Sequence, residues 1–138
     1  MKPLKELLEE SNCYFNLYEN PGVKASGFFL LIRYKFKQMN TLNTLQNWYK
    51  SKCDGNWEHS FGLKIETIDN PGWNITIDLT DTDLEDLPEK QYEFIENSED
   101  DWYGISIKNK IFSGAGDPSK LEFIINEFLM LKTCISDR

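Results

Sequence analysis

Residues 61–80 read FGLKIETIDNPGWNITIDLT, and this stretch decides the fold. Apolar and polar residues alternate on both sides of the turn-forming residues 69–72. Alternation with a period of two predicts a strand with one buried face, and Asn-Pro-Gly between two such runs predicts a tight reversal. The stretch is therefore predicted to form an antiparallel hairpin with one wet face, and we expect this hairpin at the centre of the sheet.

The sequence after this hairpin predicts further strands. Residues 91–96 are expected to form a third strand. Residues 102–108 and 111–113 alternate about Asn109-Lys110, which predicts a second hairpin. The glycine-rich residues 114–116 are expected to end the sheet. The sequence thus predicts an antiparallel sheet of four or more strands.

Helices are expected on both sides of these strands along the chain. Residues 41–53 carry apolar side chains at helical spacing, and Asp54-Gly55 ends that pattern. Asp117 is expected to cap a helix over residues 118–133, with Pro118 in its first position. The predicted fold class is α+β, an antiparallel sheet flanked by two helices. The expected main core is Leu63, Ile65, Trp73, Ile75, Ile77, Leu121, Ile124, Ile125 and Phe128.

Residues 1–38 are expected to form an extension, a short helix at 3–12 and a strand at 27–37, before a single domain at residues 39–138. The first apolar residues stand among charged ones, so we expect no signal peptide. The longest apolar run, residues 28–32, is too short to cross a bilayer. We therefore expect a cytoplasmic protein without a membrane-spanning segment.

Charge is unevenly distributed along the 138 residues. The net charge is −8, from 15 Lys and Arg against 23 Asp and Glu. Residues 1–38 hold six basic and four acidic residues, so the rest of the chain carries −10. Such a body is a poor binder of phosphate backbones, and we expect a basic protein partner rather than a nucleic acid.

The most clustered acids are expected to face that partner. They are Asp81, Asp83, Glu85, Asp86, Glu99, Asp100 and Asp101. Trp57 and Trp102 do not fit the apolar faces of the strands, so either is a candidate anchor. The alternative is that the acids only keep the protein soluble and that the contact lies on the polar face of Glu66 and Asp78.

Candidate chemistry is sparse. His59 is the only histidine and has Glu58 beside it, so a small enzyme using acid–base chemistry is one alternative function. A sugar- or peptide-binding module built on exposed tryptophans is another. A zinc triad is excluded, and Cys53, expected at a helix C-terminus, is predicted to be a buried free thiol. Residues 114–118 lack the ending of a phosphate loop, and residues 81–92 lack the glycine and final glutamate of a calcium loop. We expect no metal and no cofactor.

One block of the sequence resembles the immunity protein 53 family. It comprises LQNWY at 45–49, CDG at 53–55, WEH at 57–59, Gly62, IET at 65–67 and DNPGW at 69–73. The resemblance extends over about residues 41–133, through Asp101-Trp102 and the break before the last helix. Family-motif residues to which we assign no role are Asp54, Gly55, Glu58, His59, Glu66, Asn70, Pro71, Gly72 and Trp73.

The resemblance implies a role rather than a reaction. Such proteins bind a cognate bacterial toxin in the cytoplasm and block it, and the acidic body suggests a basic nuclease as the toxin. The implied protein is not an enzyme, acts by steric and electrostatic blockade, and is a monomer or a weak homodimer. Residues 1–38 lie outside the resemblance. They are either an added helix and strand or the product of an early start codon, and their regular alternation favours the former.

Overall fold

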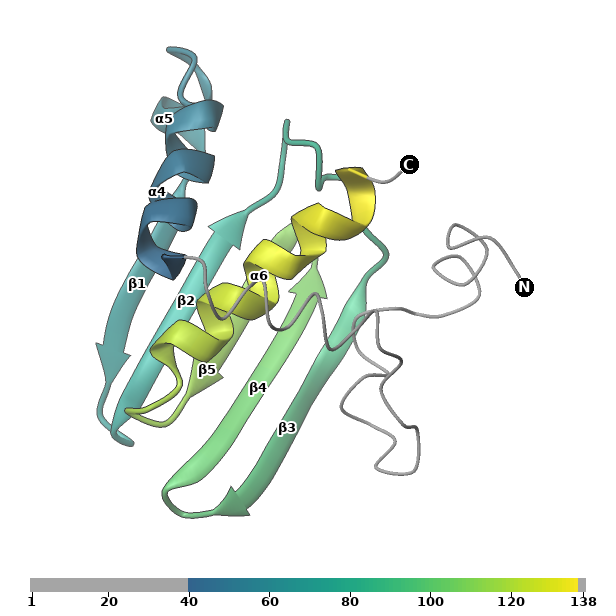
Figure 1. Ribbon diagram of the computed structural model, residues 1–138. Helices are drawn as coiled ribbons and strands as arrows, with labels where there is room; N and C mark the ends of the chain where they lie inside the picture. Colours follow the sequence, from purple (N-terminus) through teal and green to yellow (C-terminus); the bar gives the residue numbers. More distant parts are fainter. Residues whose placement is uncertain (1–39, 137–138) are drawn as a thin grey trace, which may run out of the picture.

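The computed structural model describes residues 40–136, which form an α+β fold around one five-stranded antiparallel sheet (Figure 1). The strands are β1 (Leu63–Ile68), β2 (Gly72–Asp78), β3 (Lys90–Ser98), β4 (Asp101–Lys108) and β5 (Ile111–Gly116). The helices are α4 (Thr41–Lys52), α5 (Trp57–Ser60) and α6 (Leu121–Ser136). The predicted fold class is confirmed. The extension expected at residues 1–38 lies outside the described residues.

The strand order β1-β2-β5-β4-β3 corrects one prediction. The hairpin of residues 61–80 exists, but it lies at one side of the sheet with β1 as the edge strand. β5 is central, because Phe112 pairs with Ile77 of β2 on one side and with Ile107 of β4 on the other. Alternation identifies strands, whereas strand order depends on pairing between distant segments, so the central position of the hairpin was a wrong prediction.

Residues 114–116 continue β5 instead of ending the sheet. Their glycines let α6 approach the strand closely: a methyl group on Gly114 would lie 2.3 Å from Cγ2 of Ile124, and one on Gly116 would lie 2.7 Å from Cβ of Lys120. Gly114 and Gly116 are thus a contact surface for α6. The prediction that they break the strand was wrong, because close packing of two elements was the reason for the glycines.

The last helix begins later than predicted. Asp117 stabilises a turn before α6, since its Oδ1 accepts the backbone N–H of Ser119 at 2.8 Å. The first helical hydrogen bond onto this end runs from Ile124 N–H to the carbonyl of Lys120. The helix therefore starts at Leu121 rather than at Pro118, and it continues to Ser136.

The core lies between one face of the sheet and the layer formed by α4 and α6. The predicted residues Ile75, Ile77, Ile124, Ile125 and Phe128 are buried, whereas Leu63, Ile65 and Leu121 are partly buried at its margin and Trp73 is also partly exposed. Trp48 of α4 packs edge-on against Phe128 of α6, with ring centroids 4.8 Å apart. The Thr41 hydroxyl lies 2.9 Å from Oδ1 of Asn126, which joins the start of α4 to α6.

Figure 1 shows α6 crossing the sheet and α4 beside it near β1. No helix of the described range covers the opposite face of the sheet, which we call the open face. In the described residues, no helix is long and apolar enough to cross a membrane.

Candidate functional site

The two acidic segments lie at opposite ends of the sheet (Figure 1). Residues 81–86 belong to the connection between β2 and β3, on the side where β4 turns into β5. Residues 99–101 lie at the turn between β3 and β4, on the side where α6 begins. The structure therefore does not bring the seven predicted acids together into one surface.

Part of the charge in the first segment is neutralised within the protein. Asp83 forms an ion pair with Lys52 of α4, and Glu85 forms one with Lys110. Burial alone would raise the pKa of Asp83, but the hydrogen bond and charge of Lys52 outweigh it and lower that pKa. Asp81 and Asp86 are exposed, and neither carboxylate has an ion pair within residues 40–136. They are the free charges of this end.

The second acidic segment likewise contains one ion-paired acid and two acids without an ion pair in the described chain. Asp101 forms an ion pair with Lys120 and accepts a hydrogen bond from Asn97 Nδ2 at 3.0 Å. These contacts, led by the Lys120 hydrogen bond, lower the pKa of Asp101. Glu99 and Asp100 are exposed at the turn, without an ion pair in the described chain. Of the seven predicted acids, two at each end thus have no ion pair in the described chain.

The two candidate tryptophans differ in exposure. Trp57 is only 3% exposed, packs against Trp48, and donates its indole N–H to the carbonyl of Thr80 at 2.9 Å. It is part of the core and presents no surface to a partner. Trp102 is partly exposed and pairs with Glu96 across β3 and β4. Since its neighbour Tyr103 packs on Phe123 of α6, Trp102 lies on the open face.

Three aromatic rings lie together on the open face, and we call Tyr92, Phe94 and Trp102 the aromatic platform. Phe94 and Trp102 have ring centroids 5.8 Å apart. Tyr92 is 55% exposed and Phe94 is 48% exposed, although both are large apolar groups. Exposed aromatic groups that cluster on one face are typical of interaction surfaces.

Small residues beneath the platform let the rings lie against the sheet. A methyl group on Gly104 would come within 2.3 Å of Cζ of Tyr92, so that ring occupies the space above β4. A methyl group on Gly72 would lie 3.1 Å from Cζ2 of Trp102, so this indole reaches toward β2. Packing also raises the pKa of the Tyr92 phenol through desolvation.

Tyr92 and Phe94 were missed as site residues in the sequence. The signal was present, since Tyr92, Phe94 and Glu96 alternate with Glu93 and Ile95 within the predicted third strand. Both faces of that strand carry an apolar residue and a glutamate, so the pattern does not show which face is covered. The register against β4 identifies the exposed face, because Ile95 pairs with Tyr103, which packs on α6, whereas Phe94 pairs with Gly104.

The residues Asp54 to His59 build a compact turn that side-chain to backbone hydrogen bonds hold together. Glu58 accepts the backbone N–H groups of Asp54 and Gly55, at 3.0 and 2.8 Å, and Asp54 accepts that of Trp57 at 3.0 Å. Gly55 has a φ of +96°, which favours glycine. His59 is exposed on α5. Both carboxylate oxygens of Glu58 accept backbone N–H groups, so Glu58 has a structural role in holding this turn.

The motif around the first hairpin is also structural. Glu66 accepts a hydrogen bond from Asn74 at 3.2 Å, and the Asn70–Pro71 peptide bond at the turn is cis. A methyl group on Gly72 would lie 2.2 Å from the carbonyl oxygen of Gly116, so only glycine fits there. Trp73 donates its indole N–H to the carbonyl of Pro118 at 3.0 Å and so ties β2 to the turn before α6.

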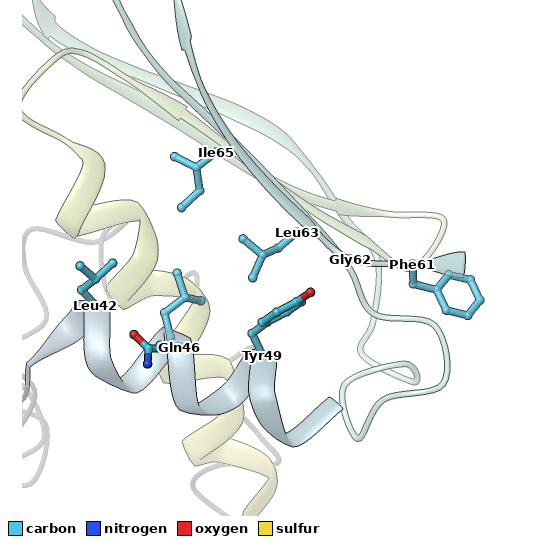
Figure 2. A pocket seen from close by; sticks show the side chains of 8 residues that line it. Leu42, Gln46, Tyr49, Phe61, Gly62, Leu63 and Ile65 are labelled. Atoms are coloured by element: carbon cyan, nitrogen blue, oxygen red, sulfur yellow. The ribbon is translucent and has the colours of Figure 1, made fainter. Parts of the chain in front are cut away.

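An apolar hollow of about 480 Å³ lies between α4 and the edge strand β1. Figure 2 shows Leu42 and Tyr49 of α4 on one side of it and Leu63 and Ile65 of β1 on the other, with Gln46 also on its wall. Phe61 at its rim points away from the hollow (Figure 2). Tyr49 and Leu42 are exposed, so this is a second apolar surface, remote from the platform.

Within residues 40–136, no three His, Cys, Asp or Glu side chains gather in an arrangement that could hold a metal ion. Cys53 corrects a prediction. It does follow the C-terminus of α4, but its thiol is exposed and lies 3.3 Å from the carbonyl oxygen of Tyr49. The predicted burial was wrong because Cys53 lies one turn after Tyr49, on a side of α4 where Tyr49 and Leu42 are exposed as well.

The model of the immunity protein 53 family matches residues 42–133 of this chain. The chain belongs to the immunity protein 53 family. Comparison with curated proteins and with solved structures gave no match. The resemblance seen in the sequence is thereby confirmed, and the matched residues include all five strands and most of α4 and α6.

The structure shows what the motif residues shared with the immunity protein 53 family do in this chain. The motif residues of the first half mainly hold turns and the first hairpin in place, as the contacts of Glu58, Gly72 and Trp73 show. Within residues 40–136, the candidate surfaces for a partner are the two acidic ends, the aromatic platform and the hollow beside α4.

Proposed function

We propose that this member of the immunity protein 53 family binds a cognate bacterial toxin domain in the cytoplasm of the cell that makes both, and blocks it. The family match over residues 42–133 carries this proposal. The protein acts by occupying the toxin's surface, with steric and electrostatic contributions. It catalyses no reaction itself, in keeping with the backbone contacts that engage Glu58 beside His59.

The charge of the protein supports a basic toxin. Asp81, Asp86, Glu99 and Asp100 are exposed carboxylates without an ion pair in the described residues. A partner with an excess of Lys and Arg is attracted to such a surface and is held in register by it. A toxin that binds nucleic acid has such an excess, because phosphate contacts require basic side chains. A basic nuclease is therefore the toxin class that we propose.

The test is neutralisation of the toxin domain encoded beside this gene. The purified domain is assayed on nucleic acid with and without an equimolar amount of the wild-type protein. We expect its activity to be lost in a stable complex seen by size-exclusion chromatography. An unchanged activity, with no complex, would contradict the immunity function. Inhibition of a toxin domain that has no nuclease activity would contradict only the proposed toxin class.

A further inference from the structure

We propose that the aromatic platform is the docking surface for an arginine-bearing segment of the toxin. The inference rests on the proposed function and adds to it the surface that is used and the side chain that is recognised. The observation behind it is the juxtaposition of three exposed rings on the open face with the free carboxylates of the β3–β4 turn.

The rings of the platform lie against the sheet, and the planes of Phe94 and Trp102 are tilted by 42° to each other. Tyr92 extends over Gly104, where any larger side chain would collide with its ring, and Trp102 reaches toward Gly72, where an added methyl group would lie 3.1 Å from Cζ2 of the indole. Phe94 pairs with Gly104 across the strands and packs against Trp102. Rings that are already held in one orientation lose little conformational freedom when a partner binds. This surface is therefore better prepared for binding than a set of mobile side chains.

The negative charge around the platform favours a cationic ligand. Glu96 lies beside Trp102 on the same face, and Glu99 and Asp100 follow in the turn at the end of β3; all three are exposed. Lys120, which reaches this end of the sheet, is already paired with Asp101 and Asp117. A phosphate-bearing ligand would meet repulsion here. A cationic side chain gains from both the carboxylates and the faces of the rings.

Arginine fits this combination better than lysine. Its planar guanidinium can stack on an aromatic face while its N–H groups reach a carboxylate in a two-pronged contact. Lysine offers a compact, strongly hydrated charge that gains less from a flat ring. The combination of rings and exposed acids on this face is thus suited to an arginine that stacks on a ring and reaches a neighbouring carboxylate.

The experiment compares two double variants of the platform. One replaces aromatic rings by apolar side chains without a ring, and the other keeps an aromatic ring at both positions. In the first variant Tyr92→Leu and Phe94→Leu remove two aromatic faces, and in the second Tyr92→Phe and Phe94→Tyr retain them. Ile111→Ala is the matched control, because Ile111 is a 39% exposed apolar residue of β5 at the other end of the sheet. Circular dichroism and the free energy of unfolding establish that each variant is folded.

We expect the double leucine variant to bind the toxin domain about tenfold more weakly, as the loss of cation–π contacts predicts. The ring-retaining variant and the Ile111→Ala control should bind like the wild type. An oligo-arginine peptide should bind the wild type more tightly than an oligo-lysine peptide of equal length, and the leucine variant should lose this preference.

Other outcomes would overturn the inference. Equal toxin binding by the wild type and the leucine variant would remove the platform from the interface and leave the immunity function standing. A loss of binding on Tyr49→Ala instead would place the contact in the hollow beside α4. A wild-type dimer that the leucine substitutions dissociate would show that a second copy covers the platform. Failure of the wild type to bind the toxin at all would overturn the proposed function itself.

Discussion

At the scale of single residues, Asp117 joins three parts of the chain. Its side chain is 1% exposed, and its carboxylate accepts the backbone N–H of Trp102 at 3.0 Å and that of Ser119 at 2.8 Å. Burial alone would raise the pKa of Asp117, but these hydrogen bonds and the nearby Lys120 outweigh it and lower the pKa to about 2. The ionised carboxylate therefore stabilises the folded state and fixes the backbone of Trp102.

We predict that Asp117→Asn lowers the free energy of unfolding at neutral pH by about 2.5 kcal/mol, the value that follows from a pKa of about 2 against about 3.9 in the unfolded chain. Because the folded pKa is lowered, this contribution is complete above about pH 4 and is lost as the pH falls toward 2. Urea unfolding at several pH values should show the difference between wild type and variant shrinking through that window. A difference that does not depend on pH would contradict the assignment.

At the scale of elements, the glycines of β5 set the distance between the sheet and α6. Gly114 faces Ile124 and Gly116 faces Lys120, so two successive positions on one face of the strand carry no side chain. Ser113 and Ala115 lie on the other face, where no described helix packs. The helix side of β5 tolerates no added volume, whereas the open side has room.

We predict that Gly114→Ala destabilises the protein by about 1–3 kcal/mol, because the added methyl group forces α6 away from the sheet. Ser113→Ala is the control on the opposite face and should change the free energy of unfolding by less than about 0.5 kcal/mol. Chemical denaturation of both variants measures the effect. Equal stabilities would mean that α6 does not rest on β5 at Gly114.

The elements were predictable where local patterns decide them. Alternation identified the strands around residues 69–72 and around Asn109-Lys110, and helical spacing identified α4. The order of strands was not predictable, since β5 becomes central through pairing with segments far away along the chain. Gly114 and Gly116 were interpreted wrongly for a related reason. Glycine occurs both where a strand ends and where a helix packs closely on a strand, and a single sequence does not distinguish the two.

The candidate site was less predictable than the fold. The acids were identifiable as exposed from their number and clustering, but their separation to opposite ends follows from the fold. Trp57 was misjudged because the short α5 turns it into the core, where Trp48 packs against it. Tyr92 and Phe94 became visible as a site only from the register of β3 against β4, which puts both on the face that no helix of residues 40–136 covers.

At the scale of the whole molecule, the free acids form two separate sources of attraction. Asp81 and Asp86 lie at one end of the sheet, and Glu99 and Asp100 lie at the other. Removing two charges at either end changes the net charge by the same amount. A comparison of the two pairs of substitutions therefore separates the effect of where the toxin binds from the effect of net charge alone.

We predict that Glu99→Gln with Asp100→Asn slows association with the toxin more than Asp81→Asn with Asp86→Asn, and reduces the salt dependence more, because the first pair borders the platform. Dissociation rates should change little in either variant. Asp81 has a φ of 57°, which asparagine also tolerates, so its substitution keeps the loop. Stopped-flow association at low and high salt gives the comparison. Equal slowing by both variants would contradict local steering.

The central position of β5 also has a consequence for the timing of protection. β5 is the last of the five strands to leave the ribosome, and it alone joins the β1–β2 hairpin to the β3–β4 hairpin. Isolated hairpins are marginally stable at best, so a nascent chain holds no assembled sheet until residues 111–116 have emerged, with α6 following them. A half-made copy thus offers a toxin no finished surface. On the proposed function, a cell that makes both proteins is protected by copies completed earlier, so the inhibitor has to accumulate ahead of its target.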